Sequence, residues 1–420
     1  MFAHVDVNSF YASCEKVFRP DLKNLPVIVL SNNDGCVIAR SQEAKKLGIK
    51  MGHPYFQLSD KFIKQNNVHV FSSNYALYAD MSNRVMDTIE SLVPYLEIYS
   101  IDEAFCDISG LDHISSFYTL GQTIRKTVNQ YTHLTVGVGI AQTKTLAKLA
   151  NYAAKTWAKT GGVVDLSDKE RQKKLMSITP VNEVWGIGRK LSKRLNELNI
   201  QTALDLSNLS PYEARQKFNI VLERTIRELN GESCLMLEDV APPRKQIICS
   251  RSFGQKVTEY NIMREAICNY TARAAEKLRE DNQYCKNITV FIKTSPFAQQ
   301  QYYSNYSSEK IIATNDTRQL LQTSEKILKR IWADNKHYQK AGVILNDFCD
   351  IEINQYHLFS DYHSKERNEK LMKVIDTINK SRYSPLFFAS QGTQGNWHMK
   401  QDQLSPSYTT RINDIANVKI

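Results

Sequence analysis

Three acidic residues stand where apolar, strand-like runs of this sequence end, and they restrict the folds open to the chain. Asp6 closes the run 2–7, and Asp102 and Glu103 lie at the turn between the runs 96–101 and 103–108. A carboxylate in an apolar strand costs free energy unless a partner compensates its charge. Adjacent strand residues face opposite sides, so Asp102 and Glu103 can share a site only if the backbone turns there. The pattern predicts either a shared carboxylate site suited to a pair of Mg²⁺ ions or three strand ends that face water.

Strand and helix patterns alternate through the first 165 residues, as in a mixed α/β domain. Helical spacing follows the first strand at residues 9–17 and returns at 76–92, where Pro94 ends it. A turn signal at 32–35 separates the apolar runs 27–30 and 36–39, which predicts a hairpin in a small inserted subdomain. A helix at 117–130 and a strand at 134–140 complete this part.

The remaining sequence divides into a helical region, an α+β region and a polar tail. Residues 169–240 lack strand signals, and 241–245 form a Pro-containing linker. Residues 246–345 give strand, helix, strand, polar loop, strand, helix and strand, a duplicated βαβ arrangement. Beyond Asp350 the chain is polar with short apolar patches, so we expect partial order there. The fold class is therefore α+β and multidomain.

Length and charge narrow the classes of partner. The 420 residues are enough for two to four domains, and 54 Lys and Arg against 44 Asp and Glu give a formal charge of +10. Dispersed positive charge favours nucleic acid first and a membrane surface second. The eight cysteines are scattered without zinc-ligand spacing, which indicates thiols in a reducing compartment. Neither a signal segment nor a membrane span is expected, so we expect a soluble cytoplasmic protein, at the nucleoid when on DNA.

Basic residues are concentrated in two further motifs. At 100° per residue Lys144, Lys148, Lys155 and Lys159 fall within about 60° of one another on a helix over 143–159. No acid intervenes before Asp165, and the face is either a solvated surface or a phosphate contact.

The second motif resembles a helix-hairpin-helix turn, in which glycines let backbone N–H groups approach a DNA phosphate. Its candidate DNA-binding residues are Gly186, Gly188, Arg189 and Lys190.

Three ordered segments resemble the signature sequences of Y-family translesion DNA polymerases. They are Phe2-Ala-His-Val-Asp-Val-Asn-Ser-Phe-Tyr-Ala-Ser-Cys-Glu15, Ser100-Ile-Asp-Glu-Ala-Phe105 and Val136-Gly-Val-Gly-Ile-Ala-Gln-Thr-Lys-Thr-Leu-Ala-Lys148. The runs 31–40, 71–85 and 246–253 resemble the branch of this family that acts in the bacterial SOS response. The resemblance implies a right-hand polymerase and an error-prone, template-directed DNA synthesis past damaged bases.

The resemblance also implies a domain order. The palm comprises 1–29 and 76–165, and small fingers occupy 30–75. A helical thumb with the helix-hairpin-helix spans 166–240, and a βαββαβ-like little finger spans 246–350. The C-terminal tail, 351–420, then carries a clamp-binding peptide.

Carried over to this chain, the family's metal site comprises Asp6, Asp102 and Glu103 as catalytic carboxylates and the carbonyl of Val7. They are expected to hold two Mg²⁺ ions. Phe10 and Tyr11 lie beside the nucleotide, where Tyr11 obstructs a ribose 2′-hydroxyl.

The resemblance assigns further contacts to the nucleotide and DNA. Lys148 contacts the triphosphate, while Cys36 and Ile38 form a roof over the nascent base pair. The family's Tyr-x-x-Arg is here Gln42-Glu-Ala-Lys45, so Lys45 offers phosphate a point charge instead of a bidentate fork. Arg251 is expected against the template backbone.

The implied partners are primed DNA, deoxynucleoside triphosphates, a UmuD′ dimer, a RecA filament and the β sliding clamp. Gln355, Leu358 and Phe359 match a Gln-x-x-Leu-Phe clamp peptide, in which two apolar side chains fill a preformed pocket. The alternative is that Leu358 and Phe359 anchor the tail to its own domain.

Two other functions fit part of the pattern. A DNA-binding scaffold would need the helix-hairpin-helix and basic surfaces but not three carboxylates. A metal-dependent nuclease would also use paired metals and acids, and the chemistry of the residues alone leaves it open.

Overall fold

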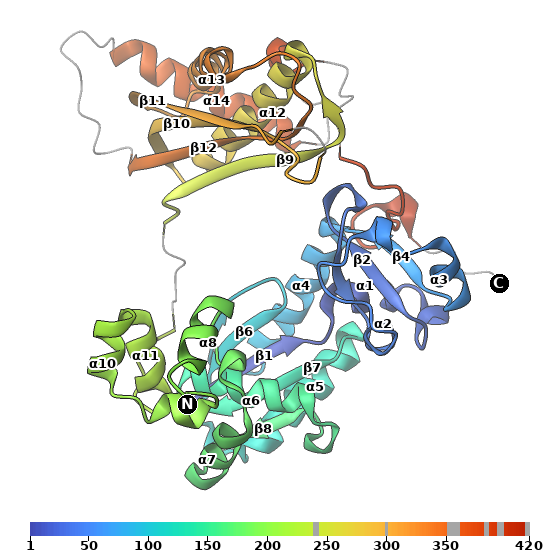
Figure 1. Cartoon of the computed structure of the whole chain (residues 1–420), viewed down its shortest axis with the longest axis vertical. Coiled ribbons are helices and arrows are strands. Elements are labelled where there is room, and N and C mark those ends of the chain that lie inside the picture. The colour runs from blue at the N-terminus through green and yellow to red at the C-terminus, as the bar shows by residue number, and fades with distance from the viewer. Residues whose placement is uncertain (238–242, 299–300, 351–361, 382–385, 393–398, 416–420) are drawn as a thin grey trace. The chain divides into compact units, whose positions relative to one another are not determined.

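The computed structural model describes residues 1–237, 243–298, 301–350, 362–381, 386–392 and 399–415, with side chains omitted for 362–366 (Figure 1). The chain forms two compact units. The first comprises Met1–Ser31, Gly35–Ala241 and Gln403–Ile420, and the second comprises Asn32–Asp34 and Pro242–Asp402.

The first unit is built around a five-stranded sheet in the order β5-β6-β1-β7-β8. Its strands are β1 (Phe2–Val7), β5 (Tyr95–Ile98), β6 (Glu103–Asp107), β7 (Val136–Ala141) and β8 (Val163–Asp165). The central strand β1 pairs antiparallel with both β6 and β7. Strand alternation directs Ala3, Val5 and Val7 into one hydrophobic core, so His4 and Asp6 face the opposite side of the sheet.

Helices cover both sides of this sheet. Buried apolar residues of α1 (Phe10–Val17), α4 (Tyr75–Glu90) and α5 (Phe117–Thr132) share the core of Val5. On the other side, α6 (Lys144–Thr156) packs along β7 and β1. The face with His4 and Asp6 is therefore the face that α6 covers.

A smaller three-stranded sheet is inserted after α1, in the order β3-β2-β4. The expected hairpin is confirmed, because β2 (Val27–Leu30) and β3 (Val37–Arg40) pair antiparallel around a turn at 32–34. β4 (His69–Ser72) adds in parallel to β2. Two short helices, α2 (Gln42–Lys46) and α3 (Asp60–Gln65), complete the insertion.

Five helices follow β8 in the same unit. They are α7 (Lys169–Ile178), α8 (Arg189–Asn196), α9 (Ala203–Ser207), α10 (Pro211–Lys217) and α11 (Ile220–Leu229). Their apolar sides share one core with α6, which includes Leu149, Leu195 and Ile226. The buried Glu228 side chain also accepts hydrogen bonds from the backbone N–H groups of Thr145, Cys234 and Leu235 at 2.8–3.0 Å. These bonds hold the end of α11 against the first turn of α6.

The second unit contains a four-stranded antiparallel sheet in the order β11-β10-β12-β9. Its elements are β9 (Gln246–Val257), α12 (Tyr260–Glu280), β10 (Gln283–Thr294), β11 (Ser304–Thr314), α13 (Thr317–Ile331) and β12 (Tyr338–Asp350). Both long helices pack on one face, as Figure 1 shows. The α+β fold class expected from the sequence is confirmed.

The sequence interpretation of the tail was incomplete, because the structure contains a further helix, α14 (Tyr362–Lys380). Among its described side chains only Met372 is buried. The helix is held by polar contacts: Asp376 accepts two hydrogen bonds from Arg279 at 2.6 and 2.7 Å, and Glu369 accepts one from Tyr284. Leu371, Val374, Ile375 and Ile378 nevertheless repeat at helical spacing, so periodicity could have indicated this helix although none of the four side chains is buried. The candidate clamp residues Gln355, Leu358 and Phe359 lie outside the described residues.

The helix expected over 143–159 is shorter than predicted. α6 ends at Thr156, Trp157 is extended, and Lys159 lies in a following 3₁₀ turn. Lys159 therefore does not share a helical face with Lys144, Lys148 and Lys155. No described helix is long and apolar enough to cross a membrane.

The close contact between β7 and α6 depends on Gly139. A Cβ on this residue would overlap the backbone oxygen of Ala147 and the backbone nitrogen of Asn151. Gly139→Ala is expected to destabilise the fold by about 1–3 kcal/mol, because neither backbone atom can move without displacing α6. Calorimetric unfolding measures the change.

Gly137→Ala is the matched control on the same strand. Its Cβ would lie 3.0 Å from Cγ of the flexible Lys155 side chain and 3.1 Å from Oδ1 of Asn151, and these atoms can adjust. Equal unfolding temperatures for the two variants would contradict the assigned role of Gly139.

Candidate active site

The three acidic residues are positioned by two adjacent strands and the turn between β5 and β6. Asp6 and Glu103 are direct partners in the antiparallel pairing of β1 with β6, so their side chains project from the same face. The turn required by the sequence is present: the backbone N–H groups of Tyr99 and Ser100 both donate to the carbonyl of Glu103 at 3.0 Å. Asp102 lies in this turn, where its Oδ1 accepts a 2.7 Å hydrogen bond from Ser100 Oγ, and its carbonyl accepts from Val7 N at 2.9 Å.

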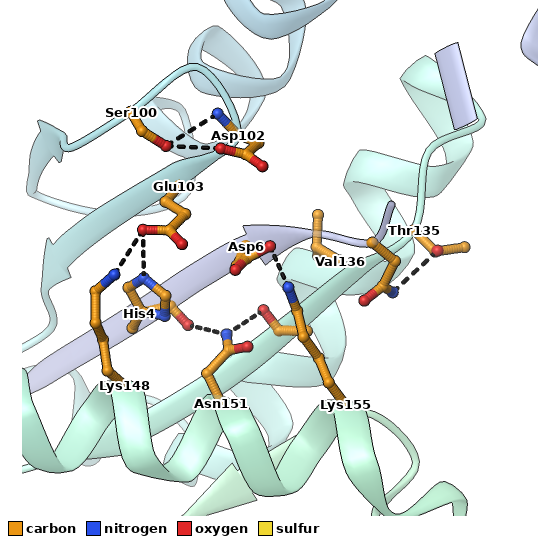
Figure 2. A network of polar contacts seen from close by, with 12 residues as sticks. His4, Asp6, Ser100, Asp102, Glu103, Thr135, Val136, Lys148, Asn151 and Lys155 are labelled. Atoms are coloured by element: carbon orange, nitrogen blue, oxygen red, sulfur yellow. Dashed lines mark hydrogen bonds and ion pairs between the residues drawn. The ribbon is translucent and has the colours of Figure 1, made fainter. Parts of the chain in front are cut away.

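Lysines of α6 compensate the charges of the strand carboxylates, as Figure 2 shows. Lys155 forms an ion pair with Asp6, and Lys148 Nζ lies 2.6 Å from Glu103 Oε2. One turn earlier, Lys144 Nζ lies 2.6 Å from Glu97 Oε2. The lysine face predicted from the sequence is therefore a row of partners for acids on the sheet.

Uncharged groups fix the geometry beneath these pairs. Asn151 on α6 donates 2.8 Å hydrogen bonds to the carbonyls of His4 and Gly137, which ties the helix to β1 and β7 (Figure 2). His4 Nε2 lies 3.7 Å from Glu103 Oε2. Burial lowers the pKa of His4 to about 4, so its imidazole is neutral at pH 7.

Burial affects Asp6 and Glu103 differently. Desolvation raises the pKa of Asp6 to about 6 against the opposing effect of Lys155, and the nearby charges of Glu103 and Asp102 raise it further. Glu103 is also partly desolvated, but its hydrogen bond with Lys148 and the nearby His4 imidazole lower its pKa well below the ordinary range. Additional positive charge near Asp6 would therefore stabilise its ionised form and lower its pKa.

The donor set fits a hard divalent cation. Asp6, Asp102, Glu103 and the Val7 carbonyl are all oxygen donors, the ligand type that Mg²⁺ prefers. Within the described part of the chain, no three His, Cys, Asp or Glu side chains are gathered closely enough to hold a metal ion. In this arrangement Glu103 and Asp6 are paired with Lys148 and Lys155 of α6.

A cavity of about 420 Å³ opens beside the carboxylates. Six residues assigned from the sequence line it together with Asp102: Asp6, Val7, Phe10, Tyr11, Ile38 and Lys45. Cys36, Lys148 and Glu103 are not among its lining residues. Cys36 instead forms an isolated bridge with Pro54, and Lys148 is engaged by Glu103.

The cavity also contains cations that the sequence interpretation did not assign to the nucleotide. Arg40 and Lys155 line it beside Lys45. Arg40 was identifiable, because it follows Ile38 by two residues on β3 and strand alternation places both on one face. Burial lowers the pKa of Lys45, and the positive charges of Arg40 and Lys155 lower it further.

Lys148 is enclosed by aromatic rings as well as paired with Glu103. Its Nζ lies 4.4 Å from the ring centre of Tyr99 and 5.2 Å from that of Trp185. Tyr99 and Trp185 themselves meet edge to face at 5.6 Å. Trp185 belongs to the helix-hairpin-helix sequence, so this cation–π cluster joins that turn to the carboxylate site within the first unit.

The residues assigned to DNA are exposed in their respective units. Gly186 has φ of +88°, and Gly188 precedes the first residue of α8, Arg189. A hollow of about 810 Å³ is lined by Gly188, Arg189 and Lys193 among others. In the second unit, Arg251 is exposed on β9.

Comparison with protein families places this geometry in a known group. Residues 5–152 match the impB/mucB/samB family and 244–358 match its C-terminal domain. Residues 168–200 match the HHH motif of the same family, and 369–418 match a domain of unknown function.

Individual relatives match along the whole chain. The chain is 56% identical to protein UmuC of Salmonella typhimurium (strain LT2) and 49% identical to protein MucB of Escherichia coli, with 100% of each chain covered. DNA polymerase IV of Clostridium acetobutylicum is 27% identical over 90% of this chain and 94% of its own.

Solved structures share the fold. A chimera of the Y-family DNA polymerases Dbh and Dpo4 superposes with a TM-score of 0.64 at 22% identity, covering 83% of this chain and 99% of its own. DinB from Sulfolobus solfataricus gives a TM-score of 0.51 at 22% identity over 82% of this chain and 98% of its own. The Y-family fold implies the use of divalent metal ions in general. The chain therefore belongs to the impB/mucB/samB family and is an error-prone DNA polymerase with the Y-family fold, most similar in sequence to UmuC among the relatives described.

Proposed function

We propose that this polymerase copies primed DNA past damaged template bases in the bacterial SOS response, with Asp6, Asp102 and Glu103 as its catalytic carboxylates. One observation carries the assignment. A single cavity is lined by the carboxylates Asp6 and Asp102 and by the cations Arg40, Lys45 and Lys155. Carboxylates suit metal ions and clustered cations suit a triphosphate, so the cavity fits both parts of a metal-bound nucleotide.

The carboxylates and the Val7 carbonyl are proposed to hold two Mg²⁺ ions. Two Mg²⁺ ions held there would supply positive charge to the attacking primer oxygen and to the leaving pyrophosphate. Lys155 both pairs with Asp6 and lines the cavity, so it can neutralise a phosphate oxygen beside that carboxylate. Arg40 and Lys45 add positive charge from the smaller sheet and from α2.

Lys148 has a positioning role in this proposal as long as it remains paired with Glu103. Its ammonium group is held by that carboxylate and by the faces of Tyr99 and Trp185. Contact with a triphosphate, as the family resemblance implies, requires Lys148 to leave Glu103. A cation held by Glu103 would compensate the same negative charge and so would weaken this ion pair.

Tyr11 is proposed to select the sugar. The residue lies in the first turn of α1, lines the cavity beside Asp6 and is half-buried. An aromatic ring at this position leaves room for a 2′-hydrogen and obstructs a 2′-hydroxyl. Phe10 and Ile38 contribute to the apolar lining, in keeping with a site that recognises the base pair by shape.

The remaining contacts are proposed from charge and sequence. Gly186, Gly188, Arg189 and Lys190 contact a DNA phosphate through backbone N–H groups and positive charge, and Arg251 contacts the template backbone. A UmuD′ dimer, a RecA filament and the β sliding clamp are the proposed protein partners, in the cytoplasm. Gln355, Leu358 and Phe359 supply the clamp peptide.

The catalytic assignment is tested by removing charge at nearly constant shape. Asp6→Asn, Asp102→Asn and Glu103→Gln are each expected to reduce primer extension by roughly 100-fold or more, while DNA affinity is retained. Extension with four deoxynucleotides and strand cleavage are measured on the same labelled duplex. Asp107→Asn on β6, which pairs with the chain's N-terminus, is the matched control. Full extension by Asp102→Asn contradicts the assignment, and cleavage without extension supports a nuclease.

Sugar selection gives a second test. Tyr11→Ala removes the ring that faces the cavity and is expected to raise ribonucleotide use, relative to deoxynucleotide use, by at least roughly tenfold. Single-turnover incorporation of matched ribo- and deoxynucleotides gives this ratio. An unchanged ratio means that Tyr11 does not select the sugar.

Clamp recruitment gives a third test. Replacing Leu358 and Phe359 together with Ala is expected to reduce synthesis stimulated by the clamp, because the two apolar side chains fill its pocket and raise the local concentration of the polymerase. Basal extension of a short primer should stay nearly intact. Equal losses with and without clamp would show that these residues stabilise the protein itself.

A further inference from the structure

The segment 403–411, here called the C-terminal strap, packs on the first unit beside α1 and α4. Ser72 N donates to the Gln403 carbonyl at 2.9 Å, and Gln403 N donates to Ser72 Oγ at 3.0 Å. Farther along, the Tyr408 ring stacks on Phe18 with a centroid distance of 4.7 Å and an interplanar angle of 6°. The strap is thus fixed on both sides of Ser405, of which only 6% is exposed.

The strap also bonds to the residue that starts α4. Asn74 caps this helix by accepting a hydrogen bond from Leu77 N. Its Nδ2 lies 3.0 Å from Ser405 Oγ, 3.2 Å from the Ser405 carbonyl and 3.3 Å from the Pro406 carbonyl. The Asn74 side chain therefore caps α4 and also bonds to the C-terminal strap.

A buried acid lies at the centre of these contacts. Glu15 on α1 is 0% exposed, and its Oε1 accepts hydrogen bonds from Tyr78 Oη at 2.6 Å and Ser405 Oγ at 3.0 Å. Its Oε2 makes no hydrogen bond within the described structure. Burial raises the pKa of Glu15 to about 7, and the two hydroxyl groups oppose this effect. Ser405 thus supplies half of the hydrogen bonds on a carboxyl group that is costly to bury.

The same acid fixes a ring that packs against Tyr11. The Tyr78 and Tyr11 rings are stacked with centroids 4.4 Å apart and an interplanar angle of 15°. Tyr75 meets Tyr11 edge to face at 6.0 Å. Tyr11 in turn lines the cavity beside Asp6. A continuous series of contacts therefore runs from Ser405 through Glu15 and Tyr78 to Tyr11.

We propose that Ser405 is a positioning residue for sugar selection: its hydroxyl holds Glu15, which orients Tyr78, the ring on which Tyr11 rests. The inference depends on the proposed role of Tyr11 and extends it to a strap more than 300 residues away in sequence. It gives the strap, which lies within the matched domain of unknown function, a role in the nucleotide site.

Loss of the Ser405 hydroxyl has a definite local consequence. Glu15 keeps Tyr78 as its remaining hydrogen-bond donor, and a buried acid with an unmet acceptor shifts to find another. Any shift of the carboxyl group moves Tyr78 Oη, because the two atoms are bonded at 2.6 Å. The Tyr11 ring then loses part of the support that keeps it over the sugar position.

Ser405→Ala is expected to raise the ratio of ribonucleotide to deoxynucleotide incorporation by roughly three- to tenfold, the size of one lost hydrogen bond. The ratio is measured by single-turnover kinetics on an undamaged primer with the full-length chain. Partial unfolding lowers both rates by the same factor and leaves the ratio unchanged, so the ratio reports position and not stability.

Ser407→Ala is the matched control on the same strap. The contacts described for Ser407 use its backbone, with N donating to Asp414 Oδ2 at 2.8 Å and O accepting from Thr410 and Arg411. Its substitution should leave the ratio as in the unmodified chain. A rise equal to that of Ser405→Ala would mean that general loosening of the strap, and not the Glu15 contact, is responsible, and the inference would fail.

A double variant tests independently whether Ser405 and Tyr78 affect the incorporation ratio through the same series of contacts. Tyr78→Phe keeps the ring and removes its bond to Glu15, so it should raise the ratio by the same route. The double variant Ser405→Ala/Tyr78→Phe should then show less than the product of the two single effects. A full product would show that Ser405 and Tyr78 act separately and would overturn the proposed series.

A second substitution at the same position covers the case in which Ser405→Ala does not fold. Ser405→Cys nearly keeps the size of the side chain but replaces the hydroxyl with a weak S–H donor, so it should raise the ratio in the same direction. An unchanged ratio in every Ser405 variant that folds, with a raised ratio in Tyr11→Ala, overturns the role of Ser405 and leaves Tyr11 in place. An unchanged ratio in Tyr11→Ala overturns sugar selection by Tyr11 itself.

Discussion

Compensation of buried carboxylates on β1 and β6 by lysines of α6 is the interaction around which the first unit is arranged. Asp6 and Glu103 project from paired strand positions, and each meets one lysine of the helix that covers them. Without Lys148 and Lys155, two like charges would lie together on a largely buried face, which costs free energy. The same carboxylates thus hold α6 in place and supply the oxygens of the proposed metal site.

The helix must come close to the sheet for these short side-chain contacts to form. Gly137 and Gly139 lie on β7 beneath α6, and at Gly139 the backbones are too close for any Cβ. Asn151 then bonds directly to carbonyls of β1 and β7. Because α6 also shares a core with α11 and anchors it through Glu228, its position determines where the following helices stand within the first unit. The ion pairs, the close approach at Gly139 and the helical core therefore all depend on the same position of α6 against the sheet.

Much of this arrangement was predictable from periodicity and charge. Strand alternation places Asp6 opposite the side chains of Val5 and Val7, and the turn at 99–102 follows from the need for Asp102 and Glu103 to share a site. Helical spacing brings Lys148 and Lys155 to one face of α6. Their partners could not be assigned, because pairing a helix residue with a strand residue requires the crossing position of the two elements. The sequence interpretation therefore offered a solvated face or a phosphate contact, and it did not include the pairing with carboxylates of the sheet.

Polar contacts between distant segments leave no periodic signal. The contact between Arg279 and Asp376, which helps to hold α14, could not be predicted for this reason. The helix itself could have been, because Leu371, Val374, Ile375 and Ile378 lie at helical spacing. Arg40 was likewise indicated by its alternation with Ile38 on β3.

Glu15 is the intermediate case. An acid on the buried side of a short helix requires a hydrogen-bond donor. The sequence shows that such a donor is needed, but it does not show which residue provides it. Tyr78 meets it from α4, 63 residues away, and Ser405 from the strap, 390 residues away. Because Tyr78 also supports Tyr11, the solution of this burial problem lies in direct contact with the nucleotide cavity. The C-terminal strap, which stabilises the buried Glu15, therefore also influences the position of Tyr11 in our proposal.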